Sequence, residues 1–167
     1  MQAVHKRLIQ RLRRSGLTVA SAESCTGGGL AKWLTDPAGS SQWFVAGWVC
    51  YSNAAKERDL GVKAVTVRRH GAVSSEVVRE LATGALKRSS AALSVAISGI
   101  AGPTGAVPGK PIGTVCFAFA LRVGRRIQIK TVTKRFRGDR LVVRAKAVEF
   151  AMRGLYSSAR EATLYTA

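Results

Sequence analysis

Ser24 and Lys56 are the two side chains of this sequence that are best placed for covalent chemistry. Ser24 follows a short apolar segment, residues 17–22, and precedes Gly27–Gly29, a pattern that predicts a turn between a buried strand and a helix. At such a turn the serine hydroxyl can face a pocket, and the amides of residues 25–28 can point at a developing oxyanion. Lys56 follows a second predicted strand, and a buried lysine of lowered pKa can accept the serine proton. Together the two residues suggest a serine hydrolase with a lysine base.

Both residues also have a plainer interpretation. Ser24 or Thr26 can be a simple helix cap beside a tight glycine turn. Lys56 can be a solvated helix lysine that pairs with Glu57 or Asp59. A serine beside glycines is weak evidence by itself, so the local pattern leaves both interpretations open.

Two neighbouring residues are further candidates for the same site. Tyr51 can orient the serine and the lysine or relay a proton, but it can also be a half-buried packing residue. Cys25 is a rival nucleophile, because a helix N-terminus lowers the pKa of a thiol. Ser24 and Cys25 are adjacent in the chain, so only one of their side chains can face a given pocket. Cys25 can also simply be a small buried apolar residue. We therefore rank Cys25 second.

Histidine and metal chemistry have little support in the sequence. The chain has two histidines, His5 in the basic first helix and His70 in a predicted polar loop, and neither suits a Ser-His-Asp triad or a His-rich metal site. The three cysteines form no CxxC pair, which argues against both a disulfide framework and a zinc site. We expect no metal and no cofactor, and a cytoplasmic protein.

The second glycine-rich turn, Gly99–Gly105, follows the predicted strand at residues 91–97. Its backbone amides are not obstructed by side chains, which suits a phosphate or a planar amide ligand. The turn contains neither the GxxxxGK[ST] nor the GxGxxG pattern. Hydrolysis of a nucleoside triphosphate is therefore not expected.

The predicted elements describe an α/β protein, a three-layer α/β/α sandwich. Helical periodicity marks residues 2–14, 30–34, 74–86 and 139–155, with Asn53, Ser74 and Asp139 as candidate helix caps. Strands are predicted at residues 17–22, 42–51 and 91–97, and residues 113–122 and 127–136 predict an antiparallel hairpin. This order indicates a mixed β-sheet covered by helices on both faces, in one domain over residues 1–167. Both glycine-rich turns then lie at the carboxyl ends of strands, where ligands of open α/β sheets bind.

Composition limits the possible classes of protein. The hydrophobic content of 47% excludes a disordered chain, and no apolar segment reaches the length of a transmembrane helix. The net charge of +18 attracts nucleic acid, anionic membranes or phosphorylated ligands. Basic residues spread along the chain also simply keep a protein in solution, so the charge does not choose among these interpretations.

Six short blocks stand in a fixed order along the chain. They are AESCTGG at 22–28, YSNAAK at 51–56, LGV at 60–62, HGAVS at 70–74, SGIAGPTG at 98–105 and KPIGTV at 110–115. In sequence, order and spacing the blocks resemble the C-terminal domain of the competence/damage-inducible CinA family, which also occurs as stand-alone nicotinamide-nucleotide amidohydrolases. The resemblance covers nearly the whole chain.

The resemblance implies an enzyme that hydrolyses the carboxamide of nicotinamide mononucleotide to nicotinate mononucleotide and ammonia, a step of pyridine-nucleotide recycling. It implies a metal-independent mechanism with Ser24 as nucleophile, Lys56 as base and Tyr51 as the third polar member. The pocket for this small-molecule substrate would be lined by Thr26, Gly27 and Gly28 and by Gly99, Ile100, Ala101, Gly102, Pro103, Thr104 and Gly105. The resemblance also implies a homo-oligomer and no membrane association.

The sequence departs from the family pattern in its second loop and in its charge. Ala106 and Val107 stand where the family loop usually continues with a glycine and a small hydroxyl residue. The 167 residues include no counterpart of the nucleotide-processing domain of full-length CinA, so no pyrophosphatase activity is expected. The basic charge supports one alternative, a catalytically degenerate CinA-like domain that binds nucleic acid. Its candidate residues are Arg122, Arg125, Arg126, Lys130, Lys134, Arg135, Arg137, Arg140 and Arg144.

Overall fold

A five-stranded mixed sheet forms the centre of the computed structural model, which describes residues 1–162. The strands are β1 (Val19–Glu23), β2 (Phe44–Val49), β3 (Leu93–Gly99), β4 (Thr114–Val123) and β5 (Arg126–Arg135), in the spatial order β2-β1-β3-β4-β5. β1 pairs in parallel with β2 and with β3, whereas β4 is antiparallel to β3 and to β5. The carboxyl ends of β1, β2 and β3 therefore lie at the same end of the sheet.

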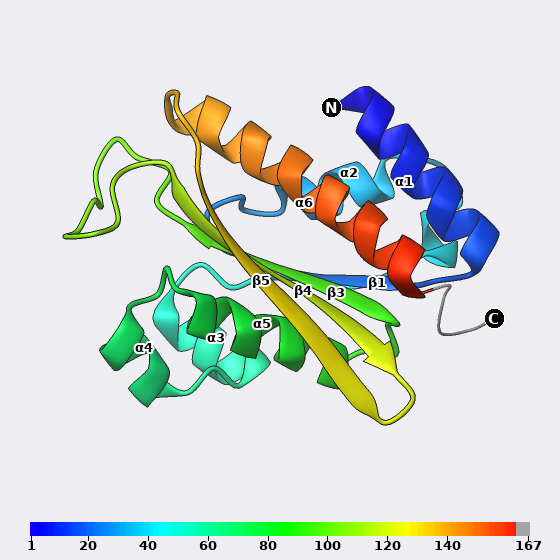
Figure 1. The fold of residues 1–167 in the computed structure, drawn as a ribbon, viewed down its shortest axis with the longest axis horizontal. Coiled ribbons are helices and arrows are strands. Elements are labelled where there is room, and N and C mark those ends of the chain that lie inside the picture. The colour runs from blue at the N-terminus through cyan, green and yellow to red at the C-terminus, as the bar shows by residue number, and fades with distance from the viewer. Residues whose placement is uncertain (163–167) are drawn as a thin grey trace.

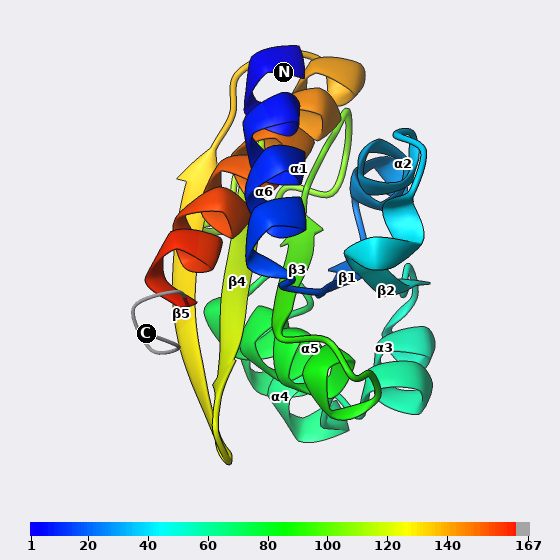
Figure 2. The same ribbon diagram turned by 90° about the vertical axis from the view of Figure 1, so that its right-hand side faces the viewer.

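Helices cover both faces of the sheet (Figure 1, Figure 2). One face carries α1 (Gln2–Ser15), α2 (Gly29–Thr35) and α6 (Arg140–Ala162), and the other carries α3 (Asn53–Leu60), α4 (Ala64–His70) and α5 (Ser75–Lys87). A 3-10 turn, Ser40–Gln42, precedes β2. This arrangement confirms the predicted three-layer α/β/α sandwich with a mixed sheet. Within residues 1–162, each helix is too short or too polar to cross a bilayer.

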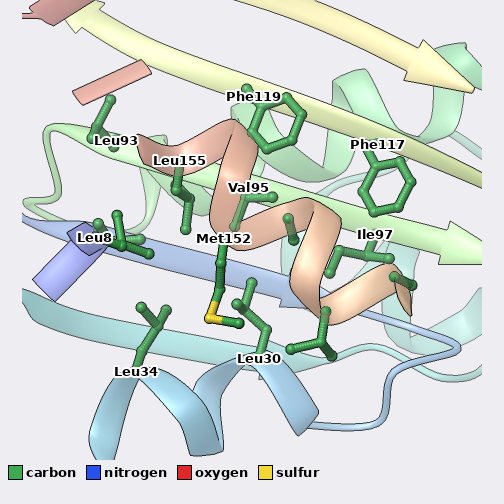
Figure 3. Close-up of a cluster of buried hydrophobic side chains, with 14 of the residues drawn as sticks. Leu8, Leu30, Leu34, Leu93, Val95, Ile97, Phe117, Phe119, Met152 and Leu155 are labelled. Carbon is green, nitrogen blue, oxygen red and sulfur yellow. The ribbon is translucent and has the colours of Figure 1, made fainter. Parts of the chain in front are cut away.

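The inner strands present large side chains to one helix layer and alanines to the other. Along β4, Phe117 and Phe119 belong to the cluster beneath α1, α2 and α6, whereas Ala118 and Ala120 belong to the cluster against α5. This division follows from the alternation of side chains along a strand. Figure 3 shows the first cluster, which also contains Leu8, Leu30, Leu34, Val95, Ile97, Met152 and Leu155.

Helix α5 approaches α3 closely at Gly84. A Cβ atom at this position would lie 2.1 Å from the main-chain oxygen of Leu60, the last residue of α3. No side chain can be accommodated at that distance without a backbone shift. The contact fixes α3, which carries Lys56, against the α5 layer.

Helix α4 was not predicted, and its existence corrects the placement of His70. The sequence pattern predicts that His70 lies in a polar loop, whereas in the structure His70 is the last residue of α4. The first turn of α4 is stabilised by Glu80 of α5, which accepts hydrogen bonds from Lys63 N at 2.8 Å and from Thr66 Oγ1 at 2.8 Å. These partners are 14 and 17 residues apart from Glu80 in the chain, so local periodicity does not reveal them.

Two of the three predicted helix caps are confirmed. Ser74 Oγ accepts from Val77 N at 3.3 Å, and Asp139 Oδ1 accepts from Val142 N at 2.9 Å. The third prediction, Asn53, is off by one residue. Ser52 is the N-cap of α3, and its Oγ accepts from Ala55 N at 3.1 Å.

Candidate active site

A cavity of about 210 Å³ lies at the carboxyl ends of β1, β2 and β3. Its wall combines residues from the turn after β1, from the start of α3, from the segment before α5, from the end of β3 and from the start of α6. These residues are Ser24, Cys25, Tyr51, Asn53, Lys56, Ala72, Val73, Ser98, Gly99, Ala101 and Arg140. The structure thus brings the three predicted catalytic residues, Ser24, Tyr51 and Lys56, to one cavity.

The turn after β1 holds Ser24 in a defined main-chain geometry. Ser24 N donates to Ile97 O at 2.9 Å, and Gly27 N donates to Ser24 O at 3.0 Å. Gly27 and Gly28 have φ angles of 59° and 87°, a left-handed conformation that glycine adopts without steric cost. The amides of residues 25, 26 and 28 make no main-chain hydrogen bond within residues 1–162. Of these three residues, Cys25 lies on the cavity wall, so its amide is the one placed to donate to a ligand oxygen there.

Glu23, the last residue of β1, caps helix α2. Its carboxylate accepts from Leu30 N at 3.0 Å and from Ala31 N at 2.8 Å, and the side chain is 1% exposed. The N-cap position itself is Gly28, without a side-chain cap. The interpretation of Ser24 or Thr26 as the cap of this helix is therefore wrong. Because Glu23 takes that role, the hydroxyl of Ser24 stays free to line the cavity.

Lys56 is buried although it lies on a short helix near the surface. Its side chain is 1% exposed, and Nζ donates to Tyr51 O at 3.0 Å and to Ser52 O at 3.4 Å. Burial lowers the pKa of Lys56 below its ordinary value. Asp59 pairs with Arg58 instead, at 2.6 Å, so the interpretation of Lys56 as a solvated lysine is wrong. The lowered pKa favours the neutral amine that a general base requires.

Tyr51 lies at the rim of the cavity rather than in the core. Its side chain is 59% exposed, so it is not the half-buried packing residue of the plainer interpretation. Its hydroxyl accepts from Arg140 Nη2 at 3.0 Å, and Arg140 Nη1 donates to Gly102 O at 2.9 Å. The contact of Tyr51 with Lys56 is made by the main-chain carbonyl. Arg140 therefore joins the Tyr51 ring to the second glycine-rich loop.

Cys25 is a buried thiol on the cavity wall. Its side chain is 6% exposed, and burial raises the pKa of Cys25 to about 12. The predicted lowering of this pKa by a helix N-terminus is outweighed by desolvation. At neutral pH Cys25 is protonated, which leaves Ser24 as the better nucleophile candidate.

The predicted substrate-binding residues divide into two groups. Gly99 and Ala101 line the cavity. The others lie behind or beside it and are not on its wall, namely Thr26, Gly27, Gly28, Ile100, Gly102, Pro103, Thr104 and Gly105. Behind the first turn, Arg144 Nη2 donates to Thr26 O at 2.9 Å. The guanidinium therefore supports the turn that carries Ser24.

Sequence reasoning did not select Ser98, Asn53, Arg140 or Glu23 for the site. Ser98 lies within a quoted block, and its Oγ donates to Ala72 O at 2.8 Å. Arg140 was considered only as part of the basic cluster, because it lies 89 residues from Tyr51. The one local signal for Arg140 was its position directly after the helix cap Asp139. Only the tertiary structure places that helix start beside the cavity.

Several members of the basic cluster of the nucleic-acid hypothesis make contacts within the protein. Arg122 donates to Leu86 O at 2.6 Å, in the last turn of α5. Arg140 and Arg144 turn towards the candidate site. Lys134 lies over the Phe150 ring at 5.8 Å. Three of the nine residues, Arg122, Arg140 and Arg144, therefore hold main-chain carbonyls of the protein itself. Two larger hollows, of about 370 and 510 Å³, contain none of the predicted catalytic residues.

Comparison with known proteins agrees with this fold. Residues 1–159 match the CinA C-terminal domain family. The chain is 52% identical over 147 residues to nicotinamide-nucleotide amidohydrolase PncC of Escherichia coli K12, which covers 88% of this chain and 87% of the relative. It is 48% identical to the protein of the same name from Pseudomonas putida, over 89% of this chain and 91% of the relative. A crystal structure of a CinA superfamily protein from Klebsiella pneumoniae superposes with a TM-score of 0.89 at 40% identity, over 95% of this chain and 97% of that one. The chain belongs to the CinA C-terminal domain family.

Proposed function

We propose that this protein hydrolyses the carboxamide of nicotinamide mononucleotide to nicotinate mononucleotide and ammonia. The observation that carries the proposal is the meeting of Ser24 with the buried Lys56 in one cavity. The names of the relatives, nicotinamide-nucleotide amidohydrolases, support this choice of substrate. The enzyme is accordingly a hydrolase that acts on an amide C–N bond.

In the proposed mechanism Ser24 is the nucleophile and Lys56 is the base. The neutral amine of Lys56 takes the proton of Ser24 Oγ as this oxygen attacks the carboxamide carbon. The negative charge on the carbonyl oxygen is stabilised by the main-chain amide of Cys25, which lies beside Ser24 on the cavity wall and makes no main-chain hydrogen bond within residues 1–162. Lys56 then returns the proton to the leaving nitrogen, and ammonia departs. A water molecule hydrolyses the resulting ester by the reverse sequence of proton transfers, which regenerates Ser24 and releases the carboxylate.

Arg140 and Tyr51 organise the mouth of the cavity in this proposal. Arg140 holds the Tyr51 hydroxyl and the carbonyl of Gly102 at the same time. It forms no ion pair with a carboxylate among the described residues, so its positive charge attracts an anionic substrate towards the cavity mouth over a longer range. The pair therefore aligns the substrate rather than transferring its proton.

The test is ammonia release from nicotinamide mononucleotide at neutral pH in the presence of a chelator. We expect turnover by the wild-type protein and none by Ser24→Ala, with both proteins folded by circular dichroism. Ser157→Ala, at an exposed position of α6, is the matched control and should keep wild-type activity. Normal turnover by Ser24→Ala would refute the mechanism, and inactive wild-type protein would refute the choice of substrate.

A further inference from the structure

A second polar cavity adjoins the candidate active site. Its volume is about 270 Å³, and it shares Val73 on its wall with the cavity of Ser24. The polar groups on its wall are the hydroxyls of Ser74, Ser75, Thr114 and Thr133, the imidazole of His70, the carboxylate of Glu76 and the ammonium of Lys110. Known ligand pockets have volumes of about 300–1,000 Å³. The cavity of Ser24 alone is below this range, and the two cavities together fall within it.

Lys110 lies where the two cavities meet. Its Nζ donates to His70 O at 2.6 Å, and it lies 3.5 Å from the position that a Cβ atom of Gly71 would take. The next two residues, Ala72 and Val73, line the cavity of Ser24. The ammonium group is therefore beside the boundary between the two cavities.

The second loop holds Lys110 in this position through a tight turn. Val107 N donates to Lys110 O at 3.2 Å, and Lys110 N donates to Val107 O at 2.9 Å. The base of the loop is closed by Gly113 N, which donates to Ile100 O at 2.7 Å. Val107, one of the two departures from the family pattern, is exposed and is absent from the walls of both cavities. The departure therefore leaves the placement of Lys110 intact.

The charges of the second cavity favour an anionic group near Lys110. Lys110 forms no ion pair within the part of the chain that the structure describes. The carboxylate of Glu76 accepts from Ser75 Oγ at 3.0 Å and lies 3.7 Å from His70 Nδ1. The carboxylate opposes a bound anion, whereas the ammonium of Lys110 attracts one. The hydroxyl hydrogens of Ser74, Ser75 and Thr114 are already donated to Gly71 O, Glu76 Oε2 and Pro111 O. The ammonium of Lys110 is therefore the donor in this cavity that suits a phosphate group.

We propose that Lys110 binds the phosphate group of the substrate. The inference rests on the proposed function, because the carboxamide at Ser24 fixes one end of the nucleotide. From that end, the ribose extends along Val73 and delivers the phosphate to the second cavity. Lys110 then distinguishes a phosphorylated amide from its unphosphorylated analogue.

The experiment compares nicotinamide mononucleotide with nicotinamide riboside, which lacks the phosphate. In Lys110→Met we expect kcat/KM for the nucleotide to fall about tenfold to a hundredfold, mainly through KM, as for the loss of one charged hydrogen bond. The value for the riboside should change less than about twofold, because the riboside makes no phosphate contact. Lys110→Arg should keep most of the preference for the nucleotide. Lys130→Met, on β5 away from both cavities, is the matched control.

A binding measurement separates this inference from the proposed function. Calorimetry with the Ser24→Ala protein should show tighter binding of the nucleotide than of the riboside, and Lys110→Met in that protein should abolish the difference. Glu76→Gln should tighten nucleotide binding, because it removes the opposing carboxylate. Equal losses for both ligands in Lys110→Met, or no loss, would overturn the phosphate site. Lys110-dependent nucleotide binding by a wild-type protein that releases no ammonia would refute the proposed function and keep the phosphate site.

Discussion

Glu23→Gln tests whether the carboxylate behind the nucleophile positions the turn that carries Ser24. The two carboxylate oxygens of Glu23 accept from Leu30 N and Ala31 N, at 3.0 and 2.8 Å, in a buried environment. A glutamine has the same shape but presents one acceptor and one donor. One main-chain amide of α2 then faces an NH₂ group, and both donors lack an acceptor.

The magnitude follows from these two contacts. A hydrogen bond to a charged group contributes about 1.5–3 kcal/mol, and a buried donor without a partner costs about 1–3 kcal/mol. We therefore expect Glu23→Gln to lower the free energy of unfolding by about 2–4 kcal/mol. Activity should fall as well, because Gly29 N and Lys32 N connect the first turn of α2 to Thr26 O and Gly28 O.

Urea denaturation followed by circular dichroism measures the first effect, and ammonia release at a temperature where the variant is folded measures the second. The control is Glu161→Gln, at an exposed position near the end of α6, which should change the stability by less than about 0.5 kcal/mol. A loss of less than about 0.5 kcal/mol in Glu23→Gln would show that the carboxylate does not hold α2. A stability loss with full activity would show that α2 does not position Ser24.

Three further predictions follow from the site and the packing. Lys56→Met should reduce kcat at neutral pH by at least about a hundredfold. In the wild type, kcat/KM should rise with pH through a midpoint below the ordinary lysine pKa of 10.5, because burial lowers the pKa of Lys56 and the neutral amine is the base. A kcat/KM that falls with rising pH would contradict this role. Cys25→Ala should retain activity within about tenfold of the wild type. Iodoacetamide should modify Cys25 slowly at pH 7, because the pKa of this thiol is about 12. Rapid inactivation by iodoacetamide at Cys25 would reverse the choice of nucleophile. Gly84→Ala should destabilise the fold by at least about 1–3 kcal/mol in thermal or urea unfolding, because the added methyl group meets Leu60 O. Thr83→Ala, at the neighbouring, partly exposed position, should have a small effect.

Most of the secondary structure was readable from the sequence because its signals are local. The β4–β5 hairpin was predicted within one residue at each end, since two β-rich segments flank Gly124 and Arg125. Ser74 and Asp139 were recognised as caps because capping involves residues three positions apart. The helix α4 was missed because Glu80, its stabilising partner, lies on another helix.

The sequence by itself determined the strand-to-helix turn that carries Ser24, through the apolar segment before it and the glycines after it. It also indicated Lys56 as a residue of the short helix that follows the second predicted strand. It did not determine whether the side chains of Ser24 and Lys56 are solvated or buried, because the same local sequence is compatible with both environments. The tertiary structure decided the environment of Lys56, because it buries this side chain against the carbonyls of Tyr51 and Ser52. It also caps α2 with Glu23 and brings Arg140 to the cavity from a helix 89 residues beyond Tyr51. Burial and charge pairing depend on which segments pack together, and packing is a property of the whole chain.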